Sequence, residues 1–300
     1  MNKTPSAAAI PTETLPSGQS LSRMAFQELS RRPLVWIMLV VLVVLALMAI
    51  FPEWFTSADP RKCQLLSARR APSGKAWFGN DIQGCDIYAR TIYGTRASLV
   101  VAILAALGST LIGGIVGLIA GYKGGAIDAV LSRMTDIVMG LPTLLGAIVI
   151  LSVLGNNDGN GMLRLALVLS MLGWATEARL MRASVLQVKE AEYIRAARVA
   201  GASEIWIALR HIVPNAITPL LVMATLSLGG YVGTEATLSY LGLGLQPPII
   251  SWGTAISDAQ PYTGVAPHML IFPSLFLVVT VLVFVLLGEA VRRAFDPRSR

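Results

Sequence analysis

The feature that most constrains this chain is a series of long apolar blocks without charged residues. The first block, residues 34–51, is an uncharged run of eighteen residues. As a helix it would be about 27 Å long, close to the roughly 30 Å of a bilayer's hydrocarbon core. Charged residues make up only 14% of the chain, whereas a soluble domain carries about 25%. The blocks therefore predict a chain that crosses a membrane several times.

Membrane-spanning segments must be helical, because lipid offers no hydrogen-bond partners to an open backbone. The sequence therefore predicts an all-α membrane protein with six transmembrane helices. The third predicted span contains Pro142, and the fourth is free of charge only over 165–176. The six predicted spans are 34–51, 97–122, 129–154, 161–182, 212–234 and 269–288.

Glycines in the second predicted span indicate how it packs. Gly113, Gly117 and Gly121 recur at four-residue intervals, so they share one face of a helix. Small residues on one face let two helix backbones approach closely. We therefore expect this face to pack against another helix of the bundle. In the third span, Arg133 and Asp136 are spaced to form a local ion pair.

The distribution of charge predicts the orientation of the spans. The net charge is +7, but the basic residues lie between apolar blocks, which argues against a nucleic-acid-binding protein. With both termini cytoplasmic, 16 of the 24 Lys and Arg residues lie inside, as the positive-inside rule favours. Seven of the eight external ones lie in 53–96, which is an exception to that rule. The prediction is a tail (1–30), a transmembrane domain (31–300), an external loop (53–95) and a cytoplasmic loop (183–212).

The chain has two cysteines, Cys63 and Cys85, and both lie in the predicted external loop. Disulfides persist outside the cell, and a bridge here would contribute roughly 3 kcal/mol by the chain-entropy estimate. A disulfide and two free thiols both remain open at this point. The sequence has no zinc-type or phosphate-loop motif. We expect no metal, cofactor or nucleotide site in the chain itself.

The cytoplasmic loop is the segment most informative about function. Residues 190–200 are good helix formers, Gly201 can end a helix, and Ser203 can cap the next one. Pro214 suits the first turn of the fifth span. The pattern predicts two short helices joined by a turn nearly free of bulky side chains. Such a turn could dock in a groove of a partner protein, or the segment could be an interfacial helix with solvated charges.

In this loop the chain resembles the permease subunits of binding-protein-dependent ATP-driven importers. Their signature is approximated by Arg195-Ala196-Ala197, three residues, Gly201, nine residues and then the tetrapeptide ending in Pro214. Other segments resemble the second permease type of the dipeptide, oligopeptide and nickel branch. These segments are Phe78-Gly79-x-Asp81-x-x-Gly84-x-Asp86, Gly121-Tyr122-x-Gly124-Gly125, Leu241-Gly242-Leu243-Gly244-x-Gln246-Pro247-Pro248 and Asp296-Pro297-Arg298.

The resemblance implies a type I ABC importer permease fold in a bacterial or archaeal cell membrane. It implies a homologous second permease subunit, two ATPase subunits that hold ATP and Mg, and an external solute-binding protein. The chain itself would not be an enzyme. The cytoplasmic loop would couple to the ATPases, and Cys85 departs from the arginine usual in the family. The residues that would make the coupling contact are Glu192, Tyr193, Ala196, Ala197, Gly201 and Ala202.

Rival interpretations are a stand-alone secondary transporter or channel, and a membrane enzyme. The first explains six spans but not the Ala-Ala-x-x-x-Gly pattern, and it should show internal repeats or discontinuous helices. The second lacks a recognisable catalytic motif in the sequence. The resemblance also leaves the transported solute open among dipeptides, oligopeptides, nickel and glutathione.

Overall fold

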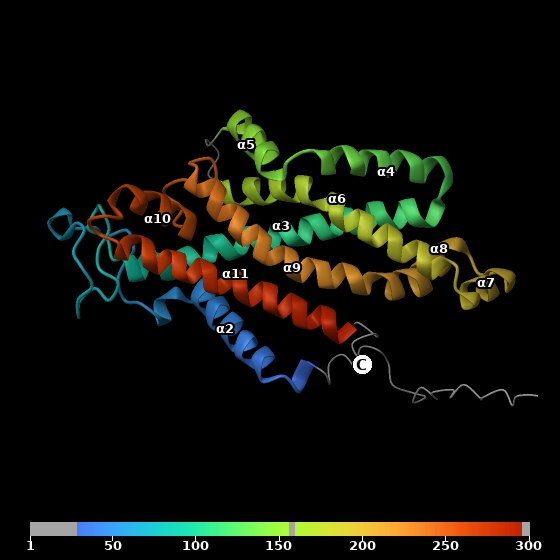
Figure 1. Ribbon diagram of the computed structural model, residues 1–300, viewed down its shortest axis with the longest axis horizontal. Helices are drawn as coiled ribbons and strands as arrows, with labels where there is room; N and C mark the ends of the chain where they lie inside the picture. Colours follow the sequence, from blue (N-terminus) through green and yellow to red (C-terminus); the bar gives the residue numbers. More distant parts are fainter. Residues whose placement is uncertain (1–28, 156–159, 296–300) are drawn as a thin grey trace, which may run out of the picture.

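The computed structural model describes residues 29–155 and 160–295, and these residues form helices and loops with no named strand. Among the helices that run along the long axis of the molecule (Figure 1) are α3 (Ile87–Lys123), α9 (Val213–Tyr240) and α11 (His268–Phe295). The predicted tail up to residue 28, residues 156–159 between the third and fourth predicted spans, and the Asp296-Pro297-Arg298 motif lie outside the described residues. The other main helices are α2 (Pro33–Ile50), α4 (Gly125–Gly140), α5 (Thr143–Leu154), α6 (Gly161–Lys189) and α10 (Trp252–Ala259).

The glycine face of α3 packs directly on the backbone of α6. A Cβ atom added to Gly117 would lie 2.4 Å from the carbonyl oxygen of Ala178, and one added to Gly113 would lie 2.6 Å from that of Trp174. Both distances are far below a normal van der Waals contact, so only glycine permits this approach. The predicted role of the glycine face in close helix packing is confirmed.

The third predicted span is wrong as a single helix. The chain breaks between α4 and α5, and the two helices are bent by 85°. Pro142 disfavours helical geometry at the residue before it, and Leu141 is accordingly extended, with φ −84° and ψ 123°. Within 29–155 and 160–295, four helices are long and apolar enough to cross a membrane, and the bent pair would add a fifth span if it counts as one. The fourth predicted span, 161–182 in α6, is not among these helices, so the count of six spans and the cytoplasmic position of the termini stay predictions.

Ion pairs hold α4 against α6. Arg182 of α6 contacts Asp128 of α4 through two hydrogen bonds of 2.5 and 2.7 Å. Arg179 donates to Asp136 at 2.8 Å. The expected local pair between Arg133 and Asp136 is therefore wrong, because Asp136 lies on the side of α4 that faces α6.

Two buried carboxyl groups lie where helices meet. Glu177 of α6 is 1% exposed and accepts hydrogen bonds from Ser109 of α3 at 3.2 Å and Ser227 of α9 at 3.3 Å. Glu235 of α9 is fully buried and accepts from Ser239 at 2.9 Å. Hydroxyl donors thus satisfy one oxygen of each carboxyl, whereas the second oxygen of each accepts no hydrogen bond from the described residues. The contacts of Glu177 link α3, α6 and α9 into one bundle.

The first helix, α2, is attached to the bundle at its outer end. Arg96 of α3 donates to the carbonyl oxygens of Ala49 at 2.6 Å and Ile50 at 2.9 Å. These carbonyls belong to the last turn of α2 and have no partner within the helix. One external cation of the sequence is thereby used to cap a helix.

The α3–α6 contact gives a first testable prediction. Gly117→Ala should destabilise the protein by about 1–3 kcal/mol, because the new methyl group overlaps the α6 backbone. Gly233→Ala is the matched control, since a Cβ at that mid-helix glycine meets nothing within 4 Å and alanine is the better helix former. Thermal unfolding of the detergent-purified protein measures both. Equal melting temperatures for the two variants would contradict the packing argument.

Candidate functional site

The cytoplasmic loop folds as a short helix, a tight turn and a second helix. The first helix is α7 (Glu192–Val199), and it ends in a Schellman motif. The N–H of Ala202 bonds the carbonyl of Ala197 at 3.1 Å, and the N–H of Gly201 bonds that of Arg198 at 3.1 Å. Gly201 has φ +83°, a conformation that glycine adopts without strain. The predicted helix stop at Gly201 is thus present.

The second helix continues into the next span. Ser203 caps α8 (Glu204–Ile207) by accepting a hydrogen bond from the N–H of Trp206 at 3.4 Å. A π-helical turn, η3 (Ala208–Ile212), then leads directly into α9. Pro214 lies in the first turn of α9, as the sequence predicts. The turn is therefore continuous in structure with α9.

One buried side chain anchors α7 to the bundle. Ile194 is 0% exposed and lies in an apolar cluster contributed by several helices. Ala197 and Ala202, on either side of the turn, are partly buried and pack against the same cluster. The remaining buried members come from α6, the α8–η3 segment and α9, namely Met181, Val185, Ile207, Ile212, Ala216 and Leu220.

Polar contacts tie the same turn to the end of α3. The hydroxyl of Tyr122 bonds the carboxylate of Glu204 and also its carbonyl oxygen, the latter at 2.9 Å. Arg198 of α7 donates to Glu204 at 3.0 Å, and this hydrogen bond raises the pKa of the Arg198 guanidinium. Lys189 at the end of α6 donates to the carbonyl of Tyr122 at 2.7 Å. The ends of α3, α6 and α9 therefore converge on this helical turn.

The structure divides the six predicted contact residues into two groups. Glu192, Tyr193, Ala196 and Gly201 are exposed, while Ala197 and Ala202 face the apolar cluster. A Cβ at Gly201 would meet nothing within 4 Å, so the outer side of the turn is open. At this end of the molecule (Figure 1), α7 forms a projecting tip.

Large apolar side chains that were not predicted from the sequence are exposed beside this turn. Val199 is 90% exposed, Ile205 74% and Leu209 63%, and Trp206 is half exposed. Their apolar character in an otherwise charged cytoplasmic loop is the signal that could have identified them. Exposed apolar groups of this size next to an open turn favour a contact with another surface.

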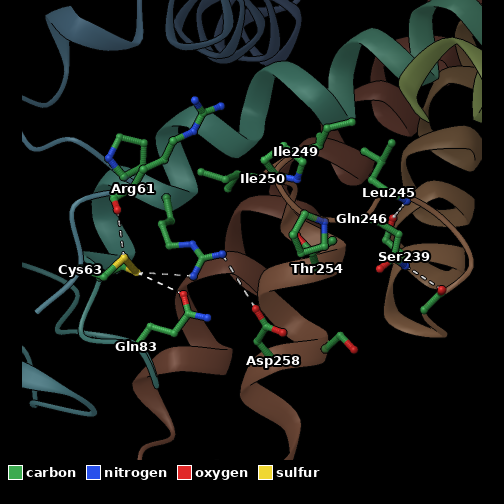
Figure 2. A pocket seen from close by; sticks show the side chains of 17 residues that line it. Arg61, Cys63, Gln83, Ser239, Leu245, Gln246, Ile249, Ile250, Thr254 and Asp258 are labelled. Carbon is green, nitrogen blue, oxygen red and sulfur yellow. Dashed lines mark hydrogen bonds and ion pairs between the residues drawn. A yellow bond between two sulfur atoms is a disulfide. The ribbon is translucent and has the colours of Figure 1, made fainter. Parts of the chain in front are cut away.

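The opposite end of the molecule holds a cavity of about 280 Å³. Cys63 and Cys85, joined by a disulfide in the structure, lie on one wall together with Gln83, and Gln246 lies on the other wall (Figure 2). Arg90 forms an ion pair with Asp81 and lies 3.9 Å from Asp258. Burial raises the pKa of the Asp258 carboxyl, whereas Arg90 acts in the opposite direction. The ion pair with Asp81 fixes the end of the external loop to α3.

In the part of the chain that the structure describes, no three His, Cys, Asp or Glu side chains converge as metal ligands. The geometry of the cytoplasmic turn is that of a contact surface: an open backbone turn, exposed apolar groups and a rigid attachment to three helices. It is suited to transmitting a displacement from a bound partner to the helix bundle.

Two known protein families match the chain. Residues 113–300 match the family described as binding-protein-dependent transport system inner membrane component. Residues 20–72 match the N-terminal TM domain of oligopeptide transport permease C. The first match contains the whole cytoplasmic loop, and the second contains α2 and the start of the external loop.

Similar proteins are named as permeases. The chain is 38% identical to the oligopeptide transport system permease protein OppC of Bacillus subtilis (strain 168), over 94% of this chain and 91% of the relative. It is 35% identical to the dipeptide transport system permease protein DppC of Alkalihalophilus pseudofirmus, over 99% of this chain and 96% of the relative. It is 38% identical to the glutathione transport system permease protein GsiD of Pectobacterium atrosepticum, over 76% and 75%.

Solved structures share the fold. A chain of the MetNI methionine ABC transporter in inward-facing conformations has a TM-score of 0.56 at 20% identity, covering 69% of this chain and 96% of that one. A chain of an amino acid ABC transporter with histidines has a TM-score of 0.51 at 21% identity, covering 68% and 94%. The predicted ABC importer permease fold is confirmed.

The anchoring of α7 gives a second prediction. Ile194→Ala should leave a cavity that costs about 2–5 kcal/mol locally, so the amides of 192–200 should exchange hydrogen faster. Val199→Ala on the same helix is the control, because Val199 is 90% exposed. Hydrogen exchange followed by mass spectrometry reports both variants. Unchanged protection of α7 in Ile194→Ala would contradict the anchoring role of Ile194.

Proposed function

The chain belongs to the family of binding-protein-dependent transport system inner membrane components, and we propose that it forms half of the translocation pathway of an ATP-driven importer. It is a multi-pass permease subunit of a bacterial cell membrane. The observation that carries the proposal is the family match over 113–300, which contains the open turn at Gly201 and the three helices attached to it. ATP hydrolysis takes place on separate ATPase subunits, which hold ATP and Mg.

The coupling contact is made by the cytoplasmic turn. Glu192, Tyr193, Ala196 and Gly201 form the exposed contact with a groove of an ATPase subunit, while Ala197 and Ala202 hold the turn on the bundle. The small side chains let the ATPase surface approach the backbone. A docked turn needs small side chains for this close approach. An interfacial helix with solvated charges would not need them.

The contacts of α7 support a route from the ATPase to the pathway. ATP binding draws two ATPase subunits together and displaces the docked turns. Ile194 transmits the displacement to α6 and α9, and Glu204 transmits it to α3 through Tyr122. The two permease subunits then shift between packed states that differ in which side of the membrane is open.

The partners are a homologous second permease, two ATPase subunits and an external solute-binding protein. The cargo is a short peptide or a related small solute, because relatives that cover most of the chain are named as oligopeptide, dipeptide and glutathione permeases. The binding protein, which is a different chain, sets the selectivity within that class.

Co-purification tests the assembly. The full-length protein is tagged, extracted gently from its own membrane, and analysed by mass spectrometry. A second permease, ATPases with phosphate-loop motifs and a solute-binding protein are the expected companions. A tagged chain that purifies alone and still transports would instead favour a stand-alone secondary transporter or channel.

The open turn gives a third prediction. Gly201→Leu should abolish uptake and substrate-stimulated ATP hydrolysis, because the side chain clashes with the docked ATPase and resists a φ of +83°. Gly155→Leu is the matched control, since Gly155 also has a positive φ and open space around its Cβ position but lies at the end of α5, away from α7. Normal uptake by Gly201→Leu would rule out docking at this turn. Membrane insertion of both variants is checked by fractionation.

A further inference from the structure

The external loop carries a cluster of cations that neither the fold nor the proposed coupling explains. Residues 60–77 contain Arg61, Lys62, Arg69, Arg70 and Lys75 and no Asp or Glu. Basic residues near membrane spans normally favour the cytoplasmic side, so this composition opposes the predicted orientation and needs another physical reason. We refer to residues 60–77 as the basic platform.

The fold uses two other external cations but not those of the platform. Arg90 pairs with Asp81, and Arg96 caps α2. By contrast, Arg61, Arg69, Arg70 and Lys75 are exposed and form no ion pair with any carboxylate in the described residues. Lys62 has one loose, exposed contact, 4.0 Å from Asp59. Within the described residues, the positive charge of the platform is therefore neutralised by no carboxylate apart from this loose contact.

The backbone of the platform is fixed rather than loose. The Cys63–Cys85 disulfide closes it, and the N–H of Gln64 bonds the carbonyl of Gly84 at 3.3 Å. Further along, the N–H of Arg69 bonds the carbonyl of Asp81 at 2.9 Å. A Cβ at Gly84 would lie 1.9 Å from the carbonyl oxygen of Gln64, so the two arms of the loop are in direct contact.

Arg69 has an unusual backbone conformation. Its φ is +58°, and within the described residues it is the one residue other than glycine with a positive φ. A long side chain in this region stores strain, and such strain persists only where the surroundings impose it. The guanidinium lies 5.6 Å above the ring of Tyr262. The loop thus holds a charged side chain at a position where glycine would adopt the backbone conformation with less strain.

Large apolar side chains accompany these cations. Leu66 is 92% exposed, Leu65 78% and Trp77 64%. Exposed leucines, a tryptophan and arginines on one fixed segment resemble the composition of protein interfaces, in which aromatic residues and Arg are enriched. A preformed surface also loses less conformational entropy on binding.

The position of the platform favours a protein partner over lipid. Phe51 and Trp54 stack at the end of α2, with ring centroids 4.6 Å apart, and such aromatic pairs are typical of the membrane–water interface. In Figure 1 the loop extends beyond this end of α2 to one extremity of the molecule, opposite α7. Lipid headgroups form a fluid layer and do not require a fixed surface shape.

We propose that the basic platform is a docking surface for an acidic protein face, with Leu65 and Leu66 inserting into an apolar hollow of that face. The partner is the external solute-binding protein of the same importer, so this inference rests on the proposed function. The cations steer an acidic partner toward the platform, and the disulfide keeps the two leucines in a fixed position.

Binding measurements on the complete importer test the platform. The complex is placed in nanodiscs of zwitterionic lipid, and the probe is the purified solute-binding protein identified by co-purification. The variants are Arg69→Ser/Arg70→Ser/Lys75→Ser, Leu65→Ser/Leu66→Ser and, as control, Arg133→Ser on α4. Basal ATP hydrolysis and melting temperature establish that each complex is assembled.

The expected result is a loss of affinity of at least about tenfold in the triple variant, with a weaker dependence on salt. The leucine variant should lose affinity but keep the salt dependence, and the control should match the unaltered complex. Equal affinity of the triple variant and the unaltered complex would contradict docking on the basic platform, while the proposed importer function would stand. Binding that requires anionic lipid would overturn it in favour of a lipid contact. An unaltered complex that binds no solute-binding protein would overturn both proposals.

Discussion

The contact between α3 and α6 sets the geometry on which the other helices depend. Gly113 and Gly117 bring two backbones within a distance that excludes even a methyl group. In a membrane, helices gain nothing from leaving water, so close van der Waals contact and buried hydrogen bonds must hold them together. The glycine contact between α3 and α6 supplies the close van der Waals contact. Glu177, bonded to serines of α3 and α9, supplies the buried hydrogen bonds.

The same α3–α6 contact determines which helices the cytoplasmic turn can contact. Because α3 and α6 are packed along their length, their cytoplasmic ends lie close enough for Lys189 to bond the carbonyl of Tyr122. The Ile194 cluster then joins α6 and α9 beneath α7. A turn attached to one helix alone could move independently of the bundle, whereas this turn contacts three helices. Under the proposed function, this attachment lets a small docking surface couple the ATPase subunits to the bundle.

At the other end, the external cations have two different roles. Arg90 and Arg96 stabilise the fold, the first in an ion pair with Asp81 and the second as a cap of α2. Those between 60 and 77 remain exposed on a disulfide-closed loop. Counting charges on each side of a membrane treats all of them alike, which is why the seven cations of 53–96 stand out as an exception to the positive-inside rule. The division between used and exposed charges exists only in three dimensions.

The sequence by itself determined the helical membrane class, the glycine face of α3 and the helix–turn–helix at Gly201, because hydropathy, four-residue spacing and turn chemistry are local properties. It also determined the family, through motifs in a fixed order. It did not determine the 85° break at Pro142, since proline can also kink a continuous span, or the partner of Asp136, which lies on another helix. It could not separate Ala196 from Ala197, of which one is exposed and the other packs inward. Only the tertiary structure decided these points, because the direction of a side chain and the partner of a charge depend on which helices pack together.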